Sequence, residues 1–404
     1  MQKLLIQETG EKVLNLFLRG LSSFSKLALL IFIAKYHPLN ETGIYGIIIG
    51  QLALGSLIIG YDFYSYSNRE IINHSKKRNQ IIFDSFYFYK YYYLLSVPFV
   101  SSLFLINQGF ITFLPFFLFL LISEHLSQEL VRILVSEKRN TEASIAVFIK
   151  QFMPSASYVI YLYISSPNLY VLFSMIIISS IFSFTYSYQR LNIKIQGLKK
   201  NLIWIKKGVK LSTIFILSTI CLRFVSTFDK TILNQYFDEA IVGIYSFLFS
   251  ISMSLNILIE VMVINFGFKD LISSGDNVKK LKEKFHSMIL ETLFYGIFFI
   301  IFLNLIFGSL INIIDKPLLG EYLLEFNFLI FIAILFSLSS IQTLYFYSKK
   351  YDSFNLILNF IFLSLFISLI LVINIDTLLE FIFCILISYT LILLIKGVFI
   401  LYDK

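Results

Sequence analysis

Two short polar stripes interrupt otherwise apolar stretches of this sequence. In each stripe a cation, two hydroxyl groups and a second cation stand at positions i, i+3, i+4 and i+7, which share one face of an α-helix over two turns. The residues at these positions are Arg19, Ser22, Ser23 and Lys26 in the first stripe and Arg223, Ser226, Thr227 and Lys230 in the second. Guanidinium and ammonium groups bind phosphates and carboxylates, so the chemistry expected of both stripes is the binding of an anion.

The surroundings of the stripes make their charges costly. Each stripe lies in a segment apolar enough to cross a bilayer, where an Arg or Lys at the centre costs about 2.5–3.5 kcal/mol. Cations at that depth normally face a water-filled interior. We therefore predict a substrate-binding cavity lined by Arg19, Lys26, Arg223, Lys230, Ser22 and Ser226. For Arg19, near one end of its segment, the alternative is a side chain that reaches the lipid headgroups.

Acidic residues inside the apolar segments form a second set of candidates. A carboxylate in a low-dielectric interior must either pair with a cation or take up a proton. We predict an ion-coupling role, as a proton or sodium relay, for Asp62, Glu124, Asp229 and Glu260. Asp229 is expected to pair with another helix, because adjacent helix positions such as 229 and 230 do not face each other. The alternative reading, a static internal lattice of ion pairs, is favoured for Glu129 and Arg132.

The composition indicates which elements must position these residues. Of 404 residues, 57% are hydrophobic and only 14% are charged, and the mean hydropathy is +0.80, whereas soluble domains carry about 25% charged residues. Apolar stretches of about 20 residues recur along the chain, which predicts an all-α polytopic membrane protein rather than a transmembrane barrel. The net charge of +8 does not indicate a nucleic-acid partner, because the basic residues lie in short loops between spans.

Twelve transmembrane helices are predicted from this pattern. Their approximate bounds are 13–36, 43–67, 81–106, 110–135, 142–164, 168–189, 211–236, 240–267, 286–313, 322–347, 354–375 and 378–400. Lys and Arg concentrate in the loops after even-numbered spans, so the positive-inside rule places both termini in the cytoplasm. The basic connection 189–210 is interpreted as an interfacial helix on anionic headgroups. The segment 276–286 is interpreted as a cytoplasmic extension of the ninth span.

The chain also predicts an internal duplication. The triplet Gly-Ile-Tyr opens the second span at Gly43 and the eighth at Gly243, an offset of 200 residues, whereas the polar stripes are offset by 204. Six spans separate equivalent positions, which is typical of parallel repeats about an axis along the membrane normal. We therefore predict two six-helix halves, residues 1–200 and 201–404, around a central cavity.

Motifs of enzymes and of metal sites are missing. The sequence contains no Walker loop, no HExxH order and no arrangement of Ser, His and Asp that predicts a nucleophile, and its four histidines are scattered. We expect no cofactor, no bound metal and no enzymatic activity.

At this point the sequence resembles a known group of membrane proteins. The matching features are the early arginine with its serine-rich continuation, short motifs at the second span and their counterparts in the second half: Arg19, Glu41-Thr-Gly43-Ile-Tyr45-Gly46, Gly60-Tyr-Asp62, Asn68-Arg69-Glu70, Asp229-Lys230, Leu233 and Val242-Gly243-Ile-Tyr245-Ser. With twelve spans in two halves, the chain resembles the Wzx-type O-antigen flippases of the multidrug/oligosaccharidyl-lipid/polysaccharide exporter superfamily.

The resemblance implies a function and partners. These flippases move an undecaprenyl-pyrophosphate-linked oligosaccharide across the bacterial cytoplasmic (inner) membrane by alternating access, for lipopolysaccharide O-antigen biosynthesis. The implied partners are that substrate, the membrane lipids and a complex with a polymerase and chain-length protein. One alternative is an ion-coupled multidrug exporter of the same superfamily, although a site for cationic drugs should be acidic. A membrane O-antigen polymerase or ligase is disfavoured, because the predicted external loops are short.

Overall fold

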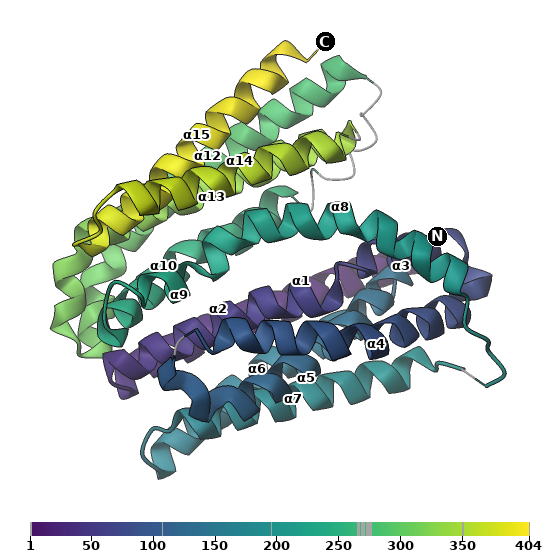
Figure 1. Ribbon diagram of the computed structural model, residues 1–404, viewed down its shortest axis with the longest axis horizontal. Coiled ribbons are helices and arrows are strands. Elements are labelled where there is room, and N and C mark those ends of the chain that lie inside the picture. The colour runs from purple at the N-terminus through teal and green to yellow at the C-terminus, as the bar shows by residue number, and fades with distance from the viewer. Residues whose placement is uncertain are drawn as a thin grey trace. The chain divides into compact units, whose positions relative to one another are not determined.

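The computed structural model describes residues 2–106, 108–194, 196–264, 267, 271, 277–349 and 351–403, and this described part is helical throughout, with no β-strand. Its α-helices are α1 (Gln2–Tyr36), α2 (Leu39–Gly60), α3 (Tyr64–Asn73), α4 (Arg78–Phe104), α5 (Leu114–Ser136), α6 (Asn140–Ile164), α7 (Leu169–Leu191), α8 (Leu202–Thr227), α9 (Asp229–Leu233), α10 (Glu239–Ile259), α12 (Val278–Ile314), α13 (Leu323–Ser348), α14 (Asp352–Val372) and α15 (Leu378–Tyr402) (Figure 1). The all-α polytopic fold expected from composition is confirmed.

Eleven helical segments of the described chain are long and apolar enough to cross a membrane. The third predicted span, 81–106, corresponds to α4, which is not among the eleven. This helix has 27 residues, and at 1.5 Å per residue it is long enough to cross the hydrocarbon core. It carries Arg78, Asp84 and Lys90, however, which lower its mean hydropathy. A twelfth crossing by α4 therefore stays a prediction.

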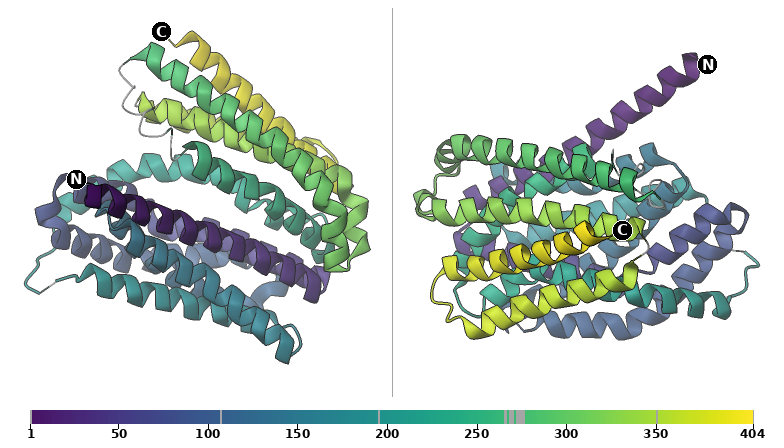
Figure 2. Two further views of the ribbon diagram at one scale, coloured as in Figure 1. Left: turned by 180° about the vertical axis from the view of Figure 1, so that it is seen from behind. Right: turned by 90° about the horizontal axis from the view of Figure 1, so that it is seen from above.

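The helices pack into two compact units. The first contains residues Met1–Phe32 and Ile48–Ile216, and the second contains Ile33–Ile47 and Leu217–Lys404. In the first unit α5, α6 and α7 pack against one another, and α3 and α4 join them. In the second unit α13 packs against α10, α12, α14 and α15 (Figure 2). The predicted boundary between residues 200 and 201 stays a prediction.

Two expected spans have wrong boundaries for local reasons. The second span was expected to continue to residue 67, but α2 ends at Gly60 because Tyr61 and Asp62 adopt left-handed conformations, with φ of 53° and 48°. The seventh was expected to run through 211–236 without interruption, but α8 ends at Thr227 and the short α9 begins at Asp229. Local backbone geometry, rather than hydropathy, sets these ends.

The expected interfacial helix in the mid-chain connection is also wrong. Helix α7 continues to Leu191 and stops at Asn192, which is left-handed with φ of 46°, a conformation that asparagine tolerates at a helix C-terminus. The described residues from there to Asn201 are not helical. The Lys- and Leu-rich residues that follow belong to the first turns of α8. By contrast, the expected extension of the ninth span is confirmed from Val278, where α12 begins; residue 276 lies outside the described residues.

The two Gly-Ile-Tyr triplets meet inside the second unit. A methyl group added to Gly43 would overlap the carbonyl oxygen of Glu239, and one added to Gly243 would overlap the carbonyl oxygen of Leu39. Each glycine thus touches the residue four positions before the other, at an offset of 200 residues. Such reciprocity is the property of a contact around a two-fold axis. The starts of α2 and α10 therefore form a backbone-to-backbone contact that only glycine permits, while the duplication of two six-helix halves stays a prediction.

Candidate functional site

The first polar stripe lies on an unbroken stretch of α1. Arg19 and Lys26 are exposed, and the Arg19 Nε donates a hydrogen bond to the Ser144 Oγ at 3.3 Å. Lys26 interacts electrostatically with Glu124. Ser22 is buried, and its hydroxyl donates to the Leu18 carbonyl oxygen at 2.7 Å. The two cations are therefore accessible to a ligand, whereas the Ser22 proton is committed to the helix backbone.

The carboxylate of Glu124 is the centre of a hydrogen-bonded cluster that joins three helices of the first unit. Its Oε1 accepts hydrogen bonds from the Lys150 Nζ of α6 at 2.8 Å and from the Gln128 Nε2 of α5 at 2.8 Å. Its Oε2 accepts a hydrogen bond from the Ser180 Oγ of α7 at 3.3 Å. The side chains of Glu124 and Lys150 are 18% and 11% exposed, so the helices of the unit do not fully enclose the pair. A carboxylate that is paired with a cation can exchange that partner for a proton or another cation when water reaches it.

The neighbouring acid on α5 is held more tightly. Arg132 Nη1 donates to Glu129 Oε1 at 2.6 Å, and the Tyr89 hydroxyl of α4 donates to Glu129 Oε2 at 2.6 Å. Glu129 is 3% exposed. The ion pair expected for Glu129 and Arg132 is present, but it lies within one helix, whereas the expected lattice joined helices. The link to a second helix is the hydrogen bond from Tyr89.

Asp62 lies in the break between α2 and α3. The residue is 4% exposed, and its Oδ1 accepts a hydrogen bond from the Ser65 hydroxyl at 2.8 Å. Its left-handed backbone is a conformation that aspartate adopts more readily than most residues. This geometry gives Asp62 a role in forming the turn, while its expected part in ion coupling stays a prediction.

In the second unit, the second stripe brings a cation and an acid together. The Lys230 Nζ lies 3.3 Å from Asp229 Oδ1, and the Tyr245 hydroxyl of α10 donates to Asp229 Oδ2 at 2.5 Å. Asp229 is 0% and Lys230 is 7% exposed. The Lys230 ammonium also lies 4.5 Å from the ring centroid of Phe249, a favourable cation–π distance. The expected partner of Asp229 on another helix exists, namely Tyr245.

The expectation that Asp229 and Lys230 would not face each other is wrong. Asp229 and Lys230 are consecutive residues in the first turn of α9, but the long lysine side chain brings its ammonium back to the Asp229 carboxylate. Both side chains also contact α10, Asp229 through Tyr245 and Lys230 through Phe249. Lys230 is thus packed inside the unit, unlike Lys26 at the corresponding place in the first stripe.

The remaining predicted residues of the second unit are more open. Arg223 is exposed, and Ser226, which is half-buried, donates to the Arg223 carbonyl oxygen at 3.2 Å. Glu260 is exposed and begins a π-helical turn, Glu260–Ile264, that follows α10. Within the described residues Glu260 forms no ion pair. π-turns inside longer helices are frequent at functional sites.

Sequence reasoning missed Lys396 in α15. This lysine is 0% exposed, and its ammonium donates to Thr343 Oγ1 at 3.1 Å, to Asn359 Oδ1 at 3.2 Å and to Ser339 Oγ at 3.4 Å. All three acceptors are neutral. An available signal was the presence of a cation inside the predicted span 378–400, because ionisable residues within spans are functional candidates by default.

The structure therefore joins some of the predicted residues and leaves others apart. Within the first unit it brings Lys26 near Glu124, and within the second it brings Asp229 and Lys230 together. Among the residues that the structure describes, no three His, Cys, Asp or Glu side chains are arranged to hold a metal ion. The arrangement offers paired charges for ion exchange and exposed cations for binding an anion.

Comparisons with solved structures identify proteins whose fold is similar to that of this chain. The chain is similar to an inward-facing multidrug resistance MATE family transporter of the MOP superfamily, with a TM-score of 0.74, 12% identity and 94% of each chain covered. For an outward-facing structure described by the same name, the TM-score is 0.69 at 13% identity, covering 96% of this chain and 92% of that one. A MOP superfamily transporter from Pyrococcus furiosus, described by a binding pocket of reverse polarity that suggests a different function, gives 0.68 at 12% identity, covering 96% and 93%.

No family model and no curated protein matches the chain. At identities of 12–13% the similarity defines the fold alone. The chain shares the fold of these MATE family structures.

Proposed function

We propose that this chain is an ion-coupled, alternating-access exporter rather than an enzyme. The observation that carries the proposal is the likeness of the fold, over nearly the whole chain, to transporters of the MOP superfamily described in inward-facing and outward-facing conformations. The cluster around Glu124 supports the coupling, because its carboxylate is paired with a lysine and its side chain is still 18% exposed.

Two classes of cargo are considered, and the comparisons favour the first. Neighbours at TM-scores of 0.74 and 0.69 are described as multidrug resistance transporters, which makes ion-coupled export of drug-like molecules the leading proposal. It requires that a cation such as H⁺ or Na⁺ be bound as the cargo is released, and Glu124 is the acid we propose for this step. In the first unit Glu124 is more exposed than Asp62, and its cationic partner Lys150 lies on another helix.

The second cargo class is an anionic lipid-linked oligosaccharide, and the polarity of the stripes favours it. Arg19, Lys26 and Arg223 are exposed cations, whereas a site for cationic drugs is expected to be acidic. Under this proposal Arg19 and Lys26 of the first unit bind the pyrophosphate of an undecaprenyl-linked glycan during its movement across the membrane, and Arg223 is the exposed candidate cation of the second unit. The description of the archaeal neighbour likewise connects pocket polarity with a change of function in that protein.

One pair of assays separates the two classes. The gene is expressed in a drug-sensitive strain that lacks its own exporters, and in a strain that lacks its own O-antigen flippase. Drug export predicts higher resistance to cationic compounds in the first strain, abolished by Glu124→Gln. Oligosaccharide flipping predicts that the undecaprenyl-linked intermediate ceases to accumulate in the second strain, and that Lys26→Ala restores the accumulation. Failure of both assays, with normal membrane levels of protein, would contradict the proposal.

A further inference from the structure

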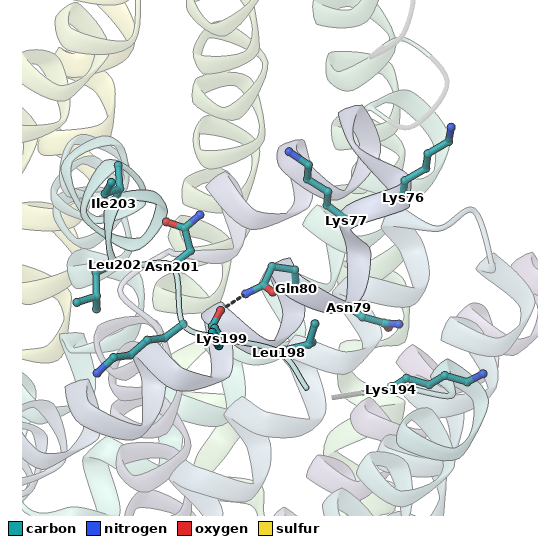
Figure 3. Close-up of a pocket in the computed structure, with 11 residues that line it drawn as sticks. Lys76, Lys77, Asn79, Gln80, Lys194, Leu198, Lys199, Asn201, Leu202 and Ile203 are labelled. Carbon is teal, nitrogen blue, oxygen red and sulfur yellow. Dashed lines mark hydrogen bonds between the residues drawn. The ribbon is translucent and has the colours of Figure 1, made fainter. Parts of the chain in front are cut away.

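A basic pocket lies at one end of the first unit, away from the polar stripe on α1. The pocket has a volume of about 890 Å³ and is lined by the short 3₁₀ turn before α4, the first turn of α4, the connection 192–201 and the first turn of α8 (Figure 3). Five of its lining residues are lysines, and none of the lining residues described is acidic: Lys76, Lys77, Lys194, Lys199 and Lys200.

These lysines are not neutralised by the rest of the described chain. All five are exposed, and within the described residues none of them forms an ion pair. The contact recorded for Lys200 is a hydrogen bond from its Nζ to the hydroxyl of Tyr87 at 3.1 Å. Five like charges around one pocket repel one another, so the arrangement is stabilised when an anion enters.

The backbone of the pocket is held in place by a buried acid, Asp84, which forms no ion pair within the described residues. Asp84 is 1% exposed, and its Oδ1 accepts a hydrogen bond from the Asn201 backbone N–H at 2.9 Å. Its other oxygen accepts from Gln80 Nε2 at 2.9 Å, and the same amide donates to the Lys199 carbonyl oxygen at 2.8 Å (Figure 3). The connection is therefore fastened to α4 with its lysines on the outside. A preformed site loses less entropy on binding than a flexible basic loop.

Apolar side chains beside the lysines indicate where the anion comes from. Leu202 and Ile203 line the same pocket and are 50% and 84% exposed. A soluble phosphate makes no apolar contact with exposed aliphatic side chains. A phospholipid, by contrast, can place its phosphate against lysines and its acyl chains against leucine and isoleucine. Basic pockets at the ends of transmembrane helices suit such headgroups. We propose that this pocket binds the headgroup of an anionic membrane phospholipid.

Trp204, the single tryptophan of the chain, provides a built-in reporter. It follows Ile203 directly, in the first turn of α8. The full-length protein is reconstituted in phosphatidylcholine vesicles that contain a small, increasing fraction of phosphatidylglycerol with brominated chains, which quench tryptophan emission on contact. Brominated phosphatidylcholine serves as the uncharged comparison. We expect saturable quenching at a lower fraction of phosphatidylglycerol than of phosphatidylcholine.

Two pairs of substitutions from opposite sides of the pocket test the assignment. Lys76→Gln with Lys77→Gln, and Lys199→Gln with Lys200→Gln, should each lower the preference for phosphatidylglycerol by roughly tenfold or more, since one lysine near an anionic surface contributes about fivefold. The matched control is Lys206→Gln with Lys207→Gln, which removes two exposed α8 lysines outside the pocket and should leave most of the preference. An unchanged Trp204 emission maximum in pure phosphatidylcholine verifies that each variant is folded.

Three results would overturn the proposal. Equal quenching of the unmodified protein by both lipids would show that the pocket has no preference for an anionic headgroup. A loss in the control pair as large as in the pocket pairs would show diffuse attraction by surface charge. Removal of the preference by inorganic pyrophosphate, but not by sulfate at equal ionic strength, would identify the ligand as a soluble diphosphate. None of these measurements depends on the cargo of the transporter.

Discussion

The two polar stripes share residue types and spacing, yet the structure uses them in opposite ways. On the continuous α1, Lys26 is exposed and near Glu124. In the second stripe the helix breaks before Asp229, and Lys230 is buried against that residue and Phe249. The difference comes from packing, because Tyr245 and Phe249 of α10 contact Asp229 and Lys230, whereas Lys26 is left exposed on α1. Equal spacing in a sequence therefore predicts equal chemistry only where the neighbouring helices are equivalent.

The largest expected effect tests whether Lys230 is a structural cation. Asp229→Asn leaves the buried ammonium without its carboxylate, and removing one partner of a buried ion pair costs about 3–5 kcal/mol. We expect a large drop in thermal stability in detergent. The double variant Asp229→Asn with Lys230→Met removes both charges and should recover most of the loss. Tyr245→Phe, which removes one hydrogen bond to Asp229, is the mild control. An Asp229→Asn protein as stable as the unmodified protein would mean that the Asp229 carboxylate does not stabilise the buried ammonium of Lys230.

The second-largest effect is expected at Glu124, whose side chain is the most exposed among the paired acids described above. Glu124→Gln removes a charge-assisted hydrogen bond from Lys150, which we expect to cost about 1–3 kcal/mol in the free energy of unfolding. If Glu124 couples ions, the same variant should also lose the dependence of transport on an imposed pH or sodium gradient in proteoliposomes. Glu129→Gln, in the static pair, should reduce stability while the surviving transport keeps its gradient dependence. The opposite pattern would assign coupling to Glu129.

A smaller effect separates the two lysines directly. Lys26→Ala should change the free energy of unfolding by about 0.5 kcal/mol or less, because the side chain is exposed. It should reduce transport of an anionic cargo roughly tenfold, equivalent to about 1.4 kcal/mol, and Lys26→Arg should keep part of the activity. Lys230→Ala should instead lower the free energy of unfolding more than it lowers transport of the cargo. If both alanine variants transport at the unmodified rate, neither stripe binds the cargo.

The smallest effect is expected at His37, which directly follows the last residue of α1. His37 is buried, and its Nδ1 lies 2.5 Å from Glu41 Oε2. The Lys316 ammonium donates a hydrogen bond to the backbone carbonyl oxygen of His37. Burial lowers the pKa of His37 from 6.5, against the opposing influence of Glu41. The unfolded chain then binds more protons at low pH, so the stability that depends on neutral His37 is present above about pH 6.5 and declines as the pH falls below it. Thermal unfolding at about pH 7.5 and 5.5 should show a smaller difference in His37→Gln than in the unmodified protein, and equal differences would contradict the prediction.

Much of the fold was predictable because hydropathy and charge act over whole segments. The positions of the long helices and the extension of the ninth predicted span at the start of α12 follow from patterns that a few residues cannot disturb. The errors concern single backbone conformations. Left-handed Tyr61 and Asn192 end α2 and α7, and nothing in the apolar periodicity marks them.

The candidate site was harder to predict because its contacts link distant parts of the chain. The acids of the site, Asp62, Glu124 and Asp229, were found from their charge. Tyr245 and Ser180 were not found as their partners, because an uncharged tyrosine or serine within a span usually has no specific function. Lys396 carried a usable signal in its charge and was overlooked. Which acid is paired and which is open depends on packing, so spacing alone cannot distinguish the Glu124 cluster from the pair of Glu129 and Arg132.

The reciprocal contact of Gly43 and Gly243 has a consequence for genetics. A clash caused by a larger side chain in a protein core can often be suppressed by a smaller residue opposite. Here the obstacle to Gly43→Ala is the carbonyl oxygen of Glu239, and the obstacle to Gly243→Ala is that of Leu39, and a carbonyl oxygen belongs to every residue. No substitution on the facing helix can make room. A selection for revertants of either alanine variant should therefore return the original glycine codon and yield no intragenic suppressor at the facing positions.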